Sequence, residues 1–174
     1  MHCLSRSIND TLSQGSAQEN IDACMKLDKF ADAWPCFEDR PHQGGHKGIG
    51  GEMSSAISSP GGNVSFLPFF RPFPLLLFSV LRFTKVFFSP RPDPIFYLHH
   101  TFLDRVWWQW QERALPARLT DFAGYNTQYE PATGWVNATL DDELNMFGII
   151  PNATIRDLMD IRGGRLCYEY VDPY

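Results

Sequence analysis

The chain has 174 residues, a length that allows one domain with a modest core. Its net charge of −5 argues against a nucleic-acid partner, because phosphate binding depends on clustered Lys and Arg. Aromatic residues make up 14% of the chain, which is not a disordered composition. The four cysteines lack the spacing of a zinc cluster, and we expect two disulfides whose pairing the sequence leaves open.

The cysteines occur together with four N-glycosylation triplets, which favour a secreted protein. The triplets begin at Asn9, Asn63, Asn137 and Asn152. Residues 1–10 contain no apolar stretch typical of a signal peptide. We therefore expect the true N-terminus to lie upstream of Met1.

The pattern of apolar residues and helix-breaking residues predicts a mainly α protein. A helix is predicted over residues 17–33, ended by Trp34-Pro35. The strongest helix is predicted over residues 93–113, with Asp93 as N-cap and Pro94 in the first turn. The remaining expectations are a Gly-rich segment over 41–62, turns over 120–139, short helices at 140–147 and 153–161 with Gly163-Gly164 stopping the second, and a short strand over 165–170.

Residues 62–92 differ in composition from both neighbours. The segment is rich in Phe and Pro and contains no Asp or Glu. Its uninterrupted apolar run, residues 74–81, is much shorter than the ~20 residues that a membrane span needs. No membrane association is therefore expected. Several prolines would also break a helix there.

Four of the five histidines form two tight groups. His42 and His46 are spaced i, i+4, which places both imidazoles on one side of a helical turn. His99 and His100 lie within the predicted aromatic helix. Neutral imidazole is a good ligand for copper, zinc and iron. Spacing alone, however, more often marks an ordinary surface pair, so the surrounding motif has to decide.

The sequence around these histidines is long and specific. Residues 93–104 read DPIFYLHHTFLD and resemble the copper-B signature of tyrosinases and hemocyanins. Residues 42–51 read HQGGHKGIGG and resemble the preceding ligand loop of fungal tyrosinases. The flanking WWQWQ run at 107–111 and the PNAT stretch at 151–154 are also similar to short secreted fungal members. The resemblance covers nearly all of the chain except residues 62–92.

The resemblance implies half of a tyrosinase-type helical bundle with long loops. It assigns His42, His46 and His100 as the ligands of one copper ion. His99, Asp104 and Gln43 would support these ligands, with Asp104 fixing orientation or simply pairing with a neighbour one turn away. The aromatic residues Phe96, Tyr97, Trp107 and Trp108 would wall the site, or would be ordinary core of the helix.

The implied partners are phenolic small molecules and O2, with copper as cofactor. Many tyrosinases have Asn directly after the first copper-B histidine, where it helps to position a water that deprotonates phenol. Gln43 occupies that place here, so o-diphenol oxidation to o-quinone is expected ahead of monophenol hydroxylation. A dinuclear site takes six imidazoles, whereas this sequence has five histidines and no copper-A motif. We therefore expect at most one copper per chain and no turnover by the chain alone.

The interruption at residues 62–92 has its own explanation. Family members run from S-P-G directly into D-P-x-F, whereas here 31 residues separate Gly61 from Asp93. Suitable codons would place an intron donor at residues 62–64 and an acceptor at 92–93, and the 93 bases between them would preserve the frame. We expect a translated intron that is not part of the fold. The alternative is a genuine loop over the copper site.

Three other functions stay open. A hemocyanin-type oxygen carrier shares the copper-B signature, although the fungal-like flanks argue against it. A non-enzymatic remnant that binds one metal ion fits the missing copper-A half. A zinc hydrolase would use the H-x-x-x-H pair, but no Glu follows His42 directly to act as a base.

Overall fold

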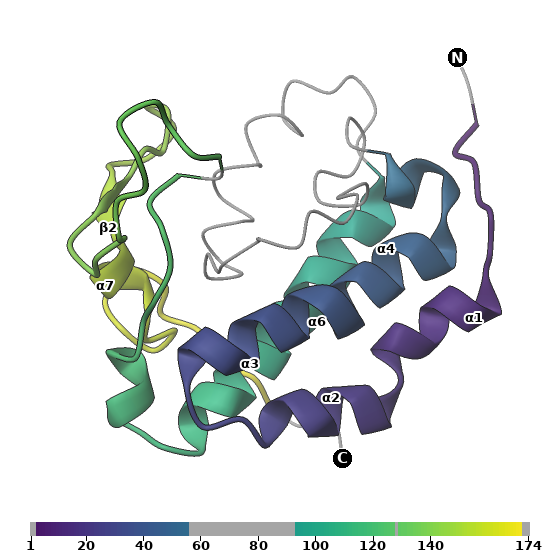
Figure 1. The fold of residues 1–174 in the computed structure, drawn as a ribbon, viewed down its shortest axis with the longest axis horizontal. Helices are drawn as coiled ribbons and strands as arrows, with labels where there is room; N and C mark the ends of the chain where they lie inside the picture. The colour runs from purple at the N-terminus through teal and green to yellow at the C-terminus, as the bar shows by residue number, and fades with distance from the viewer. Residues whose placement is uncertain (1–2, 56–92, 128, 172–174) are drawn as a thin grey trace.

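The computed structural model describes residues 3–55, 93–127 and 129–171, and this part of the chain is mainly helical (Figure 1). The longest element is α6, Pro94–Glu112. The Asp93 side chain caps it by accepting a hydrogen bond from the backbone N–H of Ile95 at 3.0 Å, and Pro94 occupies the first turn. The predicted helix over 93–113 is thereby confirmed, together with its cap.

The segment before residue 56 consists of short helices that cover one side of α6. Figure 1 shows the run from α3 to α4 lying along α6, with α1 and α2 packed against that run. The helices are α1 (Asp10–Ser13), η1 (Gln14–Ser16), α2 (Gln18–Met25), α3 (Phe30–Phe37), the π-helical η2 (Glu38–His42), α4 (Gln43–Ile49) and η3 (Gly51–Ser54).

The single helix predicted over 17–33 is wrong, because the chain breaks between α2 and α3. Side chains at and just after the end of α6 bind the chain at this break. Trp110 donates its indole N–H to the carbonyl of Leu27 at 2.7 Å, and Arg113 donates to the carbonyl of Met25 at 2.9 Å. These carbonyls at the end of α2 are thus satisfied from outside the helix. The predicted stop at Trp34-Pro35 is also wrong, since α3 continues through Pro35.

An aromatic core joins α3 to α6. The ring of Phe30 lies 5.2 Å from that of Trp107 and 5.8 Å from that of Trp34, and all three side chains are buried. Burial of this cluster stabilises α3 in spite of the proline within it. The Cys24–Cys36 disulfide ties α2 to α3. Of the two disulfides predicted, the described residues contain this one, and Cys3 and Cys167 are free and exposed.

The segment after α6 has little regular structure. It contains η4 (Ala117–Leu119), a two-stranded antiparallel pair formed by β1 (Glu143–Leu144) and β2 (Ala153–Thr154), and the short helix α7 (Ile155–Leu158). The helix predicted over 140–147 is wrong because β1 lies there and pairs with β2. The helix predicted over 153–161 is reduced to α7, which a capping box between Thr154 and Asp157 begins.

The predicted strand over 165–170 is not formed. Cys167 has a φ of 51°, in the left-handed region, which an extended strand cannot include. The proposed insert at residues 62–92 lies outside the described residues. No helix within the described residues is long and apolar enough to cross a bilayer.

Candidate metal centre

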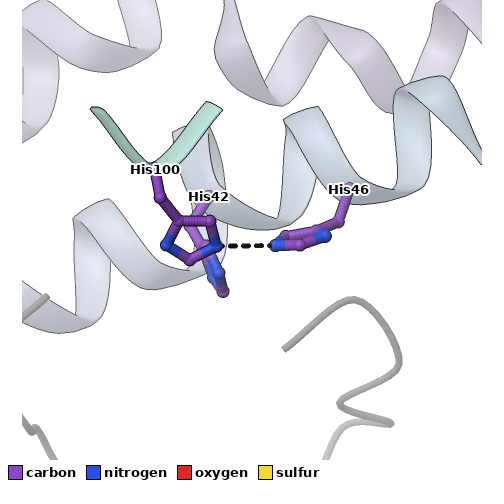
Figure 2. Close-up of side chains that lie close together, drawn as sticks. All are labelled: His42, His46 and His100. Atoms are coloured by element: carbon purple, nitrogen blue, oxygen red, sulfur yellow. Dashed lines mark hydrogen bonds between the residues drawn. The ribbon is translucent and has the colours of Figure 1, made fainter. Parts of the chain in front are cut away.

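Three buried histidines lie together between two helical segments. His42 ends η2, His46 lies in α4 and His100 lies in the middle of α6. One ring nitrogen from each lies within 4.8 Å of the others, and the three residues are between 0% and 8% exposed. Figure 2 shows the three rings directed toward one another. The structure thus brings together the three ligands that the resemblance assigns, and copper binding by them stays a prediction.

The local sequence allows the two helical segments to approach closely. A Cβ atom at Gly44 would lie 2.6 Å from the backbone nitrogen of Ser16, so only glycine lets η1 pack directly on α4. Ser16 also donates a hydrogen bond to the carbonyl of Pro41 at 2.8 Å. Because η1 fixes the backbone on either side of His42 in this way, the direction of the first ligand is set by packing.

Hydrogen bonds orient the ring of His46. Its Nδ1 lies 2.6 Å from the carbonyl oxygen of Met53. A carbonyl only accepts, so Nδ1 carries the proton and Nε2 keeps its lone pair. That Nε2 lies 3.2 Å from Nε2 of His100, the contact marked by a dashed line in Figure 2. A metal ion between these two nitrogens would be bound by two ring atoms that already face each other.

Burial favours the neutral form of His100 and His99. The pKa of His100 is lowered well below its usual value of 6.5, first by burial and then by repulsion from His42, His46 and His99. The pKa of His99 is lowered to about 4, again mainly by burial and then by His42. Neutral imidazole is the form that binds metal ions. The donor set therefore fits copper, for which imidazole is a suitable ligand.

His99 lies beside the ligands and contacts the backbone of one of them. Its Nε2 donates to the carbonyl oxygen of His42 at 3.0 Å, and the two rings are nearly parallel. A Cβ atom at Gly45 would lie 2.2 Å from the His99 ring, so glycine is what allows this ring to reach the carbonyl. His99 thus supports His42 through the main chain, and its role in metal binding stays a prediction.

Comparisons with known proteins identify the family of this chain. The family model for the common central domain of tyrosinase matches residues 1–113. The chain belongs to the tyrosinase family. The tyrosinase ustQ of Aspergillus flavus is 44% identical over 81 residues, which is 45% of this chain and 21% of that protein. The tyrosinase-like protein phomQ2 of Diaporthe leptostromiformis is 26% identical over 175 residues, which is 97% of this chain and 36% of that protein.

A third relative is named for its substrate. The N-acetyl-6-hydroxytryptophan oxidase ivoB of Emericella nidulans is 40% identical over 91 residues, or 49% of this chain and 24% of that protein. The chain spans between about a fifth and about a third of the length of these three relatives. The tyrosinase family is a family of copper-dependent oxidoreductases, and the described part of this chain brings together three histidines that could hold a metal ion.

Asp104 of this tyrosinase-family chain contacts the C-terminal segment. Its carboxylate accepts hydrogen bonds from the hydroxyls of Tyr168 at 2.5 Å and Tyr170 at 2.6 Å. Burial raises the pKa of Asp104, and the two hydrogen bonds partly oppose that rise. Burial, and then the contact with Asp104, raises the pKa of both tyrosines. Whether Asp104 also fixes ligand orientation stays a prediction, as does the role of Gln43, which is buried next to His42.

The expected aromatic wall is divided between two places. The ring of Phe96 lies 4.2 Å from that of His100 and packs with the buried Met53, so it lines the centre. Trp107 instead belongs to the main core with Phe30. Sequence reasoning missed the Met53 carbonyl, since a backbone acceptor leaves no residue signature. It also missed Glu38, although the i, i+4 spacing to His42 was visible.

Proposed function

We propose that this chain forms the copper-B half of a dinuclear copper oxidase. His42, His46 and His100 would hold one copper ion, and the observation that carries the proposal is the convergence of their ring nitrogens in a buried setting. A copper centre of this family exchanges electrons between a phenol and O2. The chain supplies neutral donors, excludes water with Phe96, and braces the first ligand through His99.

The reaction of the intact parent would be oxidation of o-diphenols. Two catechols give up four electrons and four protons to one O2, which yields two o-quinones and two waters. The hydroxyindole named for the relative from Emericella nidulans is also a phenol, and this supports a phenolic substrate class. Gln43, in place of the Asn of many tyrosinases, favours diphenols over monophenols.

For this chain by itself, a non-enzymatic role as a one-metal binder is the second candidate. It rests on the count of five histidines, because a dinuclear centre takes six. The second copper would have to be held by part of a longer parent. The Cys24–Cys36 disulfide and the exposed sequon at Asn137 support secretion of that parent.

A copper titration of the purified chain tests this function. We expect one Cu²⁺ per chain by metal analysis, with no o-quinone formed from catechol. His46→Ala should abolish stoichiometric binding, whereas His2→Ala, which removes a histidine outside the predicted ligand set, should leave it intact. Two coppers per chain together with quinone formation, or no binding by the wild-type chain, would contradict the proposal.

A second proposal concerns residues 62–92 and is tested on the transcript. We propose that residues 62–92 are a translated intron, supported by the resumption of the family motif at Asp93. Sequencing of the mature transcript is expected to show molecules without the 93 bases. Uniform retention of these bases would instead favour a genuine loop.

A further inference from the structure

Glu38 lies against the first ligand. It begins the π-helical η2, four residues before His42, and its Oε2 lies 3.0 Å from Nδ1 of His42. The imidazole is fully buried, and the glutamate side chain is 21% exposed. Pro41 lies within the same turn and has no backbone N–H to offer an α-helical bond. π-Helical turns of this kind occur frequently at functional sites.

The second ligand also has an oxygen beside Nδ1. There the contact meets the geometry of a hydrogen bond, whereas Glu38 and His42 lie within ion-pair distance without that alignment. Nδ1 of His46 lies 2.6 Å from the Met53 carbonyl, and this leaves Nε2 to face His100. In both members of the H-x-x-x-H pair, therefore, an oxygen lies next to Nδ1. The hydrogen bond at one ring nitrogen determines which nitrogen is left to bind a metal ion.

We propose that Glu38 is a positioning residue whose carboxylate holds the proton of His42 on Nδ1, so that Nε2 presents its lone pair to the metal. This inference rests on the proposed metal site. The carboxylate also places a negative charge beside the three imidazoles, which favours a bound cation. The Met53 carbonyl orients the ring of His46 in the same way but carries no charge. The two imidazoles therefore present the same nitrogen to the metal, and only His42 has a negative charge beside it.

Substitutions at Glu38 separate orientation from charge. Glu38→Ala removes the oxygen and the charge, whereas Glu38→Gln keeps an acceptor oxygen without the charge. Asp39→Ala is the matched control, because it removes one acidic charge from the next residue, which is exposed. Circular dichroism and thermal unfolding of the metal-free proteins establish that each variant is folded, and Glu38→Gln carries the test if Glu38→Ala is not.

Two measurements are made on each variant. The first is the tautomer of His42 in the metal-free protein near pH 8, from ring ¹⁵N chemical shifts. The second is Cu²⁺ affinity by competition with a chromophoric chelator. We expect the His42 proton on Nδ1 in the wild type and in Glu38→Gln, and on Nε2 in a large fraction of Glu38→Ala. Copper affinity should fall about 10–100-fold in Glu38→Ala, less in Glu38→Gln, and within about twofold of wild type in Asp39→Ala.

Three results would overturn the inference. The first is a wild-type protein with the His42 proton on Nε2. The second is a folded Glu38→Ala protein with unchanged tautomer and affinity. The third is an equal loss of affinity in Asp39→Ala, which would reduce the effect to general charge. Should the wild-type chain bind no copper, the proposed function fails, while the tautomer measurement still decides the role of Glu38.

Discussion

Gly45→Ala tests whether the close contact between α4 and His99 holds the centre together. The new Cβ would lie 2.2 Å from Cε1 and 2.5 Å from Nδ1 of the His99 ring. The ring has little freedom to move away, because it donates to the His42 carbonyl at 3.0 Å. Either the helix or the ring has to shift, and a ring that shifts loses its hydrogen bond.

The magnitude follows from three contributions. Overpacking a well-packed site costs about 1–3 kcal/mol. Losing a typical hydrogen bond costs about 0.5–1.5 kcal/mol. Replacing Gly by Ala inside a helix returns about 1 kcal/mol. With the middle of each range, Gly45→Ala should lower the free energy of unfolding by about 2 kcal/mol, whereas propensity alone predicts an increase.

Urea unfolding of the metal-free proteins, followed by tryptophan fluorescence, measures this effect. The matched control is Gly164→Ala, because nothing lies within 4 Å of a Cβ at Gly164. The double variant Gly45→Ala/His99→Ala removes the ring that clashes, and the sum of the single effects counts the lost hydrogen bond twice. It should therefore be about 3 kcal/mol more stable than that sum predicts. Additivity within about 0.5 kcal/mol would refute the reasoning.

Two further predictions concern the ends of the chain. Tyr168→Phe removes a donor to the partly buried carboxylate of Asp104 and should cost about 1.5–3 kcal/mol at pH 7. The pKa of Asp104 is higher in the folded protein than the unfolded value of 3.8, so protonation of Asp104 stabilises the folded state. This contribution is complete below pH 3.8 and is lost as the pH rises through the folded-state pKa. The cost of Tyr168→Phe should therefore shrink toward pH 4 in thermal unfolding, while Tyr129→Phe, at an exposed site, changes stability little at either pH. Arg6→Leu leaves the fully buried Asp93 without its bidentate partner and should cost about 2–3 kcal/mol, below the range for fully buried pairs because Arg6 is 28% exposed. A cost under about 0.5 kcal/mol by urea unfolding would place the pair among ordinary surface ion pairs.

Local signals in the sequence were sufficient for α6 and for the histidine groups. The cap at Asp93 and the absence of Gly or Pro through residue 112 are properties of neighbouring residues, and they predicted the helix within one residue at each end. The two histidine groups were readable because the copper-B motif surrounds them. The convergence of the rings was inferred from the resemblance, since spacing alone could not bring residues 46 and 100 together.

The errors arose where distant residues decide the local structure. The break after α2 depends on Trp110, which lies more than 80 residues away in the sequence. The tail after residue 164 alternates as a strand would, yet Tyr168 bonds to Asp104 and the chain turns at Cys167. The stop expected before Pro35 failed because buried aromatic packing outweighs one missing hydrogen bond.

The orientation of α6 is what places the third ligand, and contacts from separate parts of the chain fix it. Asp93 at the start is bound by an arginine from the N-terminal segment, and Asp104 is bound by two tyrosines near the C-terminus. His99 is tied to the carbonyl of the first ligand, and Trp110 to the end of α2. Asp93 and Asp104 are eleven residues apart, as are His99 and Trp110, so each pair shares one face of the helix and the two pairs lie on different faces. Contacts on two faces restrain the rotation of the helix about its own axis as well as its position. A rotation would move His100 away from the other two imidazoles. Substitutions that break these contacts should therefore weaken metal binding more than equally destabilising changes in the β1–β2 segment.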